Sequence, residues 1–368
     1  MNRLFKISFL LIIILSIFYF SLYKNIGIEK YLNDNYVSKY KVNDLYNSKE
    51  LNYRMLLDND EKEIYDLYIS KLINFETSLK IDMSKYNYSH EHLLFEKFIK
   101  VNQALIMDHP EIIYFGYPSM STFDNKTLNV SIIYALNKEE YNYALKDIEN
   151  QISKIKNNTS NLNDYEKVKY VYEYLGNKNE YGVRGSSISQ SAYSAFNDNL
   201  SPVCAGYARA SEIIFNNIGI TSVLISGKLK SNWFSGDSHE WNVVKLDNKY
   251  YNYDVTQSSI GKSTTGNISY YGFLNNNKGI LSPSNKKSAP IINGTTYDYY
   301  KYNNLEYIYK ENNTTQLKDI IDKSNNKYIE LRIKNIDKFK MDFNSIKSDL
   351  NLKSYILIDN IIILEKNR

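Results

Sequence analysis

The distribution of apolar and polar positions first separates the N-terminus from the rest of the chain. An uncharged apolar run extends from Ile7 to Tyr23, and the cations Arg3 and Lys6 precede it. The run approaches the roughly 20 residues needed to cross a bilayer, and the cations favour a cytoplasmic N-terminus. No small-x-small cleavage site follows it. We therefore expect residues 1–24 to be an uncleaved, single-pass signal anchor rather than a cleaved signal peptide, and residues 25–49 to be a juxtamembrane stalk, with the bulk of the chain extracellular.

Helical and strand-like spacing alternate in the next segment. Apolar residues near helical spacing predict helices over residues 58–79, 90–107 and 139–155. Short apolar runs at 112–115 and 128–134 predict strands. These elements define a small α+β domain, residues 50–157, that carries no catalytic constellation of its own.

The central segment, residues 158–280, contains two helices with readable starts. Asn163 or Asp164 can cap the first. For the second, Ser201 is a good N-cap, Pro202 suits the first helical position, and Gly219 ends the helix near Asn217. Strands are predicted over 221–224, 239–246 and 249–255. The C-terminal segment, residues 281–368, predicts a small α/β domain of alternating strands and helices, over 305–309, 316–322, 328–333, 337–350 and 355–364.

Composition narrows the function classes. Hydrophobic residues make up 43% of the chain and charged residues 23%, as expected for globular domains. The net charge of +4 comes without a block of one sign, which argues against nucleic-acid binding. A single cysteine excludes an internal disulfide and a Cys₂ or Cys₄ metal site. The motif His90-Glu91-His92 is a poor metal site because imidazoles at i and i+2 on a helix diverge. We expect no metal and no cofactor.

The single cysteine, Cys204, lies at the start of a predicted helix, and His239 and Asp254 follow on two predicted strands. Cysteine, histidine and aspartate in this order can supply a thiol nucleophile, its base and the group that orients the base. A helix N-terminus and a nearby imidazolium both favour the reactive thiolate. The backbone N–H of Cys204 is a candidate oxyanion donor, and Gln190 is a candidate second donor, as is Tyr193.

Strand parity tests whether the three side chains can meet. Asp247-Asn248 is a credible two-residue hairpin turn. If Leu246 pairs with Lys249, His239 and Asp254 share a face as diagonal neighbours; a shift of the turn by one place would put them directly opposite. Both registers allow contact. Asn242 points to the other face and is a poor orienting group.

These motifs resemble the transglutaminase-like superfamily of papain-type thiol enzymes, in particular its bacterial extracellular members. The residues that carry the resemblance are Val203-Cys204-Ala205-Gly206-Tyr207-Ala208, Gly219-Ile220, Gly227, His239-Glu240-Trp241-Asn242-Val243-Val244, Leu246-Asp247 and Tyr253-Asp254-Val255-Thr256. The resemblance implies an α+β fold in which a cysteine helix packs on an antiparallel sheet, with Cys204 as nucleophile, His239 as base and Asp254 as orienting acid. The chain departs from the usual pattern at Ser201-Pro202, Glu240 and Gln257, where a glycine, a small residue and a tryptophan are common.

The resemblance also frames the expected function. We expect a thiol enzyme that attacks a carboxamide or peptide carbonyl of a protein or peptide substrate, such as a cell-wall or surface component, and passes the acyl group to an amine or to water. An inactive cell-surface binding or scaffold protein of the same fold is the alternative. Trp233, Trp241 and Tyr207 are candidates for the substrate rim, although Trp241 is equally well explained as a core aromatic.

Overall fold

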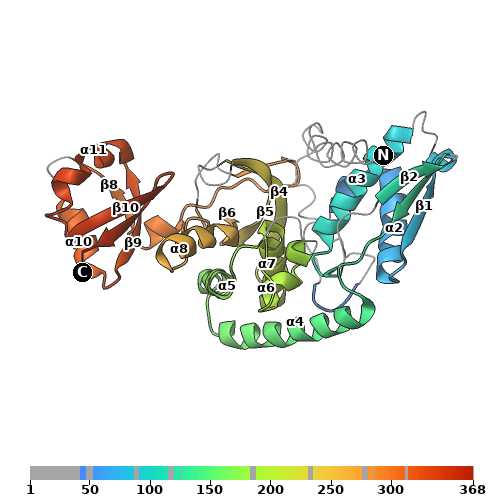
Figure 1. Ribbon diagram of the computed structural model, residues 1–368, viewed down its shortest axis with the longest axis horizontal. Helices are drawn as coiled ribbons and strands as arrows, with labels where there is room; N and C mark the ends of the chain where they lie inside the picture. Colours follow the sequence, from blue (N-terminus) through green and yellow to red (C-terminus); the bar gives the residue numbers. More distant parts are fainter. Residues whose placement is uncertain are drawn as a thin grey trace.

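The computed structural model describes residues 42–46, 53–86, 91–114, 120–124, 126–182, 188–230, 235–275, 281–284, 286–310 and 314–367, and their strands form three sheets (Figure 1). The expected anchor, residues 1–24, lies outside these residues, as does most of the expected stalk. Among the helices that are described, none is long and apolar enough to cross a membrane.

In the described residues, the N-terminal unit is a three-stranded antiparallel sheet with two α-helices and two 3₁₀ helices. It comprises η2 (Tyr53–Leu56), α2 (Asn59–Ile73), β1 (Ser78–Asp82), η3 (Met83–Tyr86), α3 (Glu91–Asp108), β2 (Met120–Asp124) and β3 (Thr127–Ser131), with strand order β1-β3-β2. The prediction of one helix over 58–79 was wrong beyond Ile73, because Phe75 adopts a left-handed conformation (φ 55°) that ends the helix, and Leu79 lies in β1. The strand predicted at 112–115 was also wrong: Ile112, Ile113 and Tyr114 are buried in a turn.

The central unit places a group of helices against one antiparallel sheet. Its helices are α4 (Lys138–Thr159), α5 (Asp164–Lys178), η4 (Ile188–Gln190), α6 (Tyr193–Phe196), α7 (Cys204–Ile218), η5 (Val255–Gln257) and α8 (Ser258–Thr265). Its strands are β4 (Ser222–Lys230), β5 (Ser235–Leu246), β6 (Lys249–Tyr253) and β7 (Leu281–Pro283), in the order β6-β5-β4-β7. Asn163 caps α5 and forms a capping box with Glu166. Of the two predicted N-caps, Asn163 and Asp164, the first is therefore confirmed. Because β7 pairs with β4, the central sheet extends past the domain boundary expected at residue 280.

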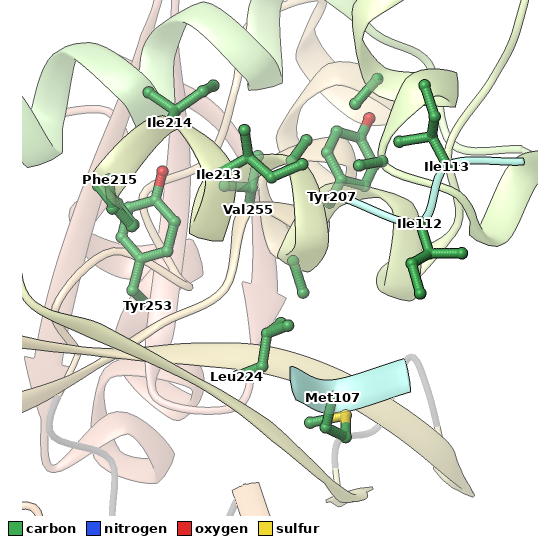
Figure 2. Packing of buried hydrophobic residues seen from close by; sticks show 14 of the residues in the cluster. Met107, Ile112, Ile113, Tyr207, Ile213, Ile214, Phe215, Leu224, Tyr253 and Val255 are labelled. Atoms are coloured by element: carbon green, nitrogen blue, oxygen red, sulfur yellow. The ribbon is translucent and has the colours of Figure 1, made fainter. Parts of the chain in front are cut away.

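Helix α7 packs on this sheet through an apolar face. Ile213, Ile214 and Phe215 are fully buried, and the Phe215 ring contacts the edge of Tyr253 at a centroid distance of 4.9 Å. Figure 2 shows Phe215 beside Tyr253 of β6 and Ile213 beside Val255 of η5, whereas Ile214 lies on the opposite side of the helix. The expected arrangement of a cysteine helix on an antiparallel sheet is therefore confirmed.

The turn between β5 and β6 sets the register of the central hairpin. Asp247 and Asn248 both have positive φ (46° and 58°), which matches the twist of antiparallel strands. Leu246 pairs with Lys249, as in the first of the two predicted registers.

The C-terminal unit is a four-stranded sheet with three helices among the described residues. It contains α9 (Tyr299–Tyr302), β8 (Glu306–Ile308), α10 (Thr315–Lys323), β9 (Tyr328–Lys334), α11 (Ile336–Ile346), β10 (Leu352–Ile358) and β11 (Ile361–Lys366), in the order β10-β11-β9-β8. The strand predicted over 355–364 is in fact a hairpin, because Asp359 adopts a positive φ (52°) and reverses the chain.

Side chains of the C-terminal unit attach it to the segment that follows α8. Glu330 accepts a hydrogen bond from the backbone N–H of Tyr270 (3.0 Å), and an Arg332 Nη donates to Asn275 Oδ1 (2.7 Å). Ile358, Ile361 and Ile363 belong to the same hydrophobic core as α7. The C-terminal unit is therefore packed against the central unit rather than joined to it by a linker alone.

Candidate active site

Cys204 is the first residue of α7. The helix was predicted to begin at Pro202 with Ser201 as N-cap, but the N-cap is Val203, which makes no side-chain cap bond. The backbone N–H of Val203 donates to the carbonyl of Ser189 in η4 (3.0 Å), and this bond ties the residue before the helix to η4. The half-buried thiol of Cys204 thus lies at the end of the helix where backbone N–H groups lack helical partners.

His239 lies on β5, opposite Gly227 of β4. Its side chain is buried, and the ring of Trp241 stacks beside it with a centroid distance of 6.1 Å and an interplanar angle of 19°. A Cβ on Gly227 would lie 2.3 Å from the carbonyl oxygen of Ser282 and 2.7 Å from the Trp241 ring. Glycine at this position therefore leaves room for both the tryptophan beside His239 and strand β7.

Asp254 is the residue at which the chain leaves β6 and enters η5. Its carboxylate is buried and accepts three hydrogen bonds. Oδ2 contacts His239 Nε2 at 2.8 Å and accepts from Gln257 Nε2 at 3.0 Å, and Oδ1 accepts from the backbone N–H of Thr256 at 3.1 Å. The backbone N–H of Asp254 donates to the carbonyl of Gly272 (2.9 Å). Both the side chain and the backbone of Asp254 are held in place.

His239 is hydrogen-bonded to Asp254 and interacts with Cys204. Burial lowers the pKa of the His239 imidazole, but the charge and hydrogen bond of Asp254, together with the hydrogen bond and charge of Cys204, outweigh burial and raise the pKa to about 10. Since Nε2 contacts Asp254, the nitrogen left for the thiol is Nδ1. The imidazolium form is therefore favoured at neutral pH, next to a cysteine at a helix N-terminus.

The contact between His239 and Asp254 differs in one respect from the predicted pairing. Backbone pairing between β5 and β6 ends at Asn242 and Tyr253, so Asp254 has no backbone partner on β5. Only the side chains of His239 and Asp254 connect the two strands at this point. Asn242 lies on the other face, as predicted: its amide donates to Glu212 of α7 (3.0 Å).

Glu240 and Arg209 form an ion pair that sequence reasoning missed. The Arg209 Nε and an Nη of the same guanidinium contact the two carboxylate oxygens of Glu240 at 3.1 and 2.7 Å, with side-chain exposures of 14% and 17%. The pair joins α7 to the strand of His239. The unusual residue after His239 was noted in the sequence, but its partner depends on how α7 is rotated against the sheet.

The candidate rim and oxyanion residues occupy different environments. Trp241 and Tyr207 are each 1% exposed, so both are core side chains and do not line an accessible surface. Burial fits the core-aromatic interpretation of Trp241, whose indole N–H donates to Asn252 (3.3 Å). Trp233 lies outside the described residues. Gln190 is partly exposed in η4, the element that is bonded to Val203, and Tyr193 is buried in α6.

A comparison with protein families covers the three candidate residues. Residues 151–255 match the model of the Transglutaminase-like superfamily. The match includes Cys204, His239 and Asp254 but covers less than half of the chain. No curated protein matches.

Two solved structures are similar to parts of the chain. One is the crystal structure of a TGase, at 16% identity and a TM-score of 0.27, with 38% of this chain and 44% of that chain covered. The other is the crystal structure of a proposed cysteine protease from Cytophaga hutchinsonii, at 14% identity and a TM-score of 0.27, with 47% and 69% covered. The chain thus spans less than half the length of the first of these.

Proposed function

We propose that the chain is a thiol enzyme of the transglutaminase-like type, in which Cys204 attacks a carboxamide or peptide carbonyl. The observation that carries this proposal is His239, whose imidazole is hydrogen-bonded to Asp254 (2.8 Å) and interacts with Cys204, the first residue of α7. The match of residues 151–255 to the Transglutaminase-like superfamily supports it.

In the proposed reaction the thiolate of Cys204 adds to the carbonyl carbon. The backbone N–H of Cys204 donates to the developing oxyanion, and Gln190 is the candidate second donor. The imidazolium of His239 gives its proton to the departing nitrogen, so ammonia or an amine leaves and a thioester remains. His239 then takes a proton from the incoming amine or water, which releases the acyl group as an amide or an acid. Asp254 keeps the imidazole oriented throughout.

Iodoacetamide labelling tests the thiolate directly, because the chain has one cysteine and every labelled thiol is Cys204. We expect Cys204 to be labelled faster in the wild type than in His239→Gln at pH 6 to 8, because a nearby imidazolium favours the thiolate. His239→Gln should restore the profile of an isolated thiol. The matched control is His109→Gln, since His109 is also buried beside a carboxylate, Glu111, at 2.8 Å.

Turnover is tested with casein and an amine donor, with amine incorporation and ammonia release as readouts. Loss of both in Cys204→Ala and in His239→Gln, but not in His109→Gln, supports the enzyme. A wild-type labelling profile like that of an isolated thiol, with no product that depends on Cys204, would reject it in favour of the inactive binding or scaffold protein.

We also propose that this chemistry takes place outside the cell membrane, on a protein or peptide substrate at the cell surface. The proposal rests on the apolar run from Ile7 to Tyr23 and the cations that precede it. Protease added to intact cells should degrade the bulk of the chain while the N-terminal segment stays in the membrane fraction. Full-length protein in the medium, or cleavage near residue 25, would contradict the anchor.

A further inference from the structure

Gln257 has a side chain whose position is hard to explain by stability. It is buried, with 2% of its surface exposed, and its Oε1 has no hydrogen-bond partner among the described residues. Burying an amide with one unsatisfied end costs free energy that an apolar side chain of the same length would not cost. The compensating feature is the bond from Nε2 to Asp254 Oδ2 (3.0 Å).

The chemistry of the partner fixes which end of the amide faces Asp254. A carboxylate only accepts hydrogen bonds, so the NH₂ group must point toward it and Oε1 must point away. Asp254 Oδ2 is also the oxygen that contacts His239 Nε2 (2.8 Å). One oxygen therefore meets both the histidine and the glutamine amide.

The other oxygen of the carboxylate is held from the backbone. Oδ1 accepts from the N–H of Thr256 (3.1 Å), which fixes one corner of the group but leaves it free to rotate about that bond. The Gln257 amide supplies the second fixed point. We propose that Gln257 is a positioning residue, whose amide holds the Asp254 carboxylate in the orientation in which Oδ2 accepts from His239. This inference rests on the proposed triad and adds to it a fourth residue that does not touch the substrate.

The other titratable groups near Asp254 do not compete for this role. Besides His239 and the Cys204 thiol beyond it, Tyr172 of α5, Tyr253 of β6 and Tyr271 interact with its charge among the described residues. Burial raises the pKa of each of these tyrosines, so all three stay neutral across the range in which the site would work. The test can therefore be read over pH 6 to 11, a range that spans the wild-type pKa of His239 of about 10.

Two variants separate positioning from packing. Gln257→Met keeps the length and removes the donor. Gln257→Glu keeps the shape: the neutral acid can donate its O–H to Asp254, whereas the ionised form places a second negative charge against it. The matched controls are Gln151→Met and Gln151→Glu, because Gln151 Nε2 donates to another carboxylate, Asp147 Oδ1 (3.0 Å), on α4.

The first readout is the ¹⁵N NMR titration of the His239 imidazole, which is tractable because the chain has four histidines. His239→Gln assigns the signal. In Gln257→Met we expect the pKa of His239 to fall by about one unit, equivalent to tenfold, because the carboxylate is no longer held against the ring. The Gln151 variants should titrate like the wild type.

The second readout is the iodoacetamide rate constant of Cys204. In Gln257→Met it should fall at pH 6, because an imidazolium that Asp254 no longer orients is less well placed to favour the thiolate. In Gln257→Glu it should match the wild type at the lowest pH and drop as the new carboxyl ionises, a pH-dependent loss that a packing defect would not produce. Should Gln257→Met fail to fold by circular dichroism, this pH-dependent loss in Gln257→Glu decides the question alone.

A wild-type His239 titration in folded Gln257→Met, or a labelling profile of Gln257→Glu parallel to that of the wild type, would overturn the positioning role. The NMR readout does not depend on turnover. If wild-type Cys204 labels like an isolated thiol while Gln257→Met still shifts His239, the proposed enzyme fails and the role of Gln257 in holding Asp254 stands.

Discussion

Raising the pH through neutrality tests whether Cys204 and His239 form an ion pair. In an unfolded chain histidine loses its proton near pH 6.5 and cysteine near pH 8.5. In the folded protein burial lowers the pKa of His239, but Asp254 and Cys204 more than offset this and raise it to about 10. Taken alone, His239 makes the folded state bind more protons than the unfolded state above pH 6.5. Its contribution to stability is therefore complete below pH 6.5 and is lost as the pH rises toward 10.

A thiolate at Cys204 would cancel that loss. In a folded ion pair His239 holds a proton and Cys204 does not, whereas in the unfolded chain between pH 6.5 and 8.5 the cysteine holds a proton and the histidine does not. The folded and unfolded states would then bind the same number of protons in this pH range. One proton corresponds to about 1.4 kcal/mol per pH unit. We therefore expect the free energy of unfolding of Cys204→Ala to fall by up to about 3 kcal/mol over these two units, relative to that of the wild type.

The assay is urea unfolding at pH 6.5, 7.5 and 8.5, followed by tryptophan fluorescence. Both tryptophans, Trp233 and Trp241, lie in the central segment, so the signal reports on the domain of interest. Groups that titrate in both proteins, such as Asp108, whose pKa burial raises to about 6, cancel in the difference. Because Cys204 helps to raise the pKa of His239, that pKa is first measured by NMR in Cys204→Ala; if it stays above 8.5, parallel curves for the two proteins would mean that Cys204 keeps its proton and would refute the ion pair.

Two further substitutions test how the site is supported. Gly272→Ala places a Cβ 2.0 Å from the carbonyl oxygen of Asp254. We therefore expect this variant to lower the free energy of unfolding by about 2 kcal/mol or more and to slow the labelling of Cys204. Wild-type values of both quantities would contradict the close approach of Gly272 to Asp254. Glu240→Gln weakens the bidentate ion pair with Arg209 and leaves a partly buried guanidinium without its counter-charge. The free energy of unfolding, measured with urea, should fall by about 1–2 kcal/mol. An unchanged midpoint of urea unfolding would rule out a role of the ion pair in stability.

The hairpin that brings His239 and Asp254 together could be predicted because its determinants are local. Asp247 and Asn248 tolerate the left-handed conformation that a two-residue turn needs, and side-chain parity follows from the turn. The start of α7 could not be predicted in this way, because it depends on a hydrogen bond to a carbonyl from a distant part of the chain. The backbone N–H of Val203 is bonded to Ser189, and this contact outweighs the capping preference of Ser201.

Burial explains the other differences at the site. Trp241 and Tyr207 lie close in sequence to His239 and Cys204, but the side chains of both are buried in the core. The contact between Gln257 and Asp254 joins residues three apart, yet it requires the chain to leave β6 at Asp254 and enter η5. In the sequence Gln257 departs from a family pattern in which tryptophan is common. The turn from β6 into η5 brings its amide to the Asp254 carboxylate, which is the contact on which the proposed positioning role rests.

Glu240 shows how a charge next to the candidate base can be compatible with it. Neighbouring residues on a strand face opposite sides, so the Glu240 carboxylate points away from His239 and meets Arg209 of α7. Besides burial, which lowers it, the largest influences on the pKa of His239 come from Asp254 and Cys204, which raise it. Removing the arginine would leave Glu240 as an unpaired, partly buried anion one residue from the imidazole. The glutamate at position 240, where a small residue is common, therefore depends on Arg209. We expect a substitution of one of these two residues to need a matching substitution of the other if the function is to be kept.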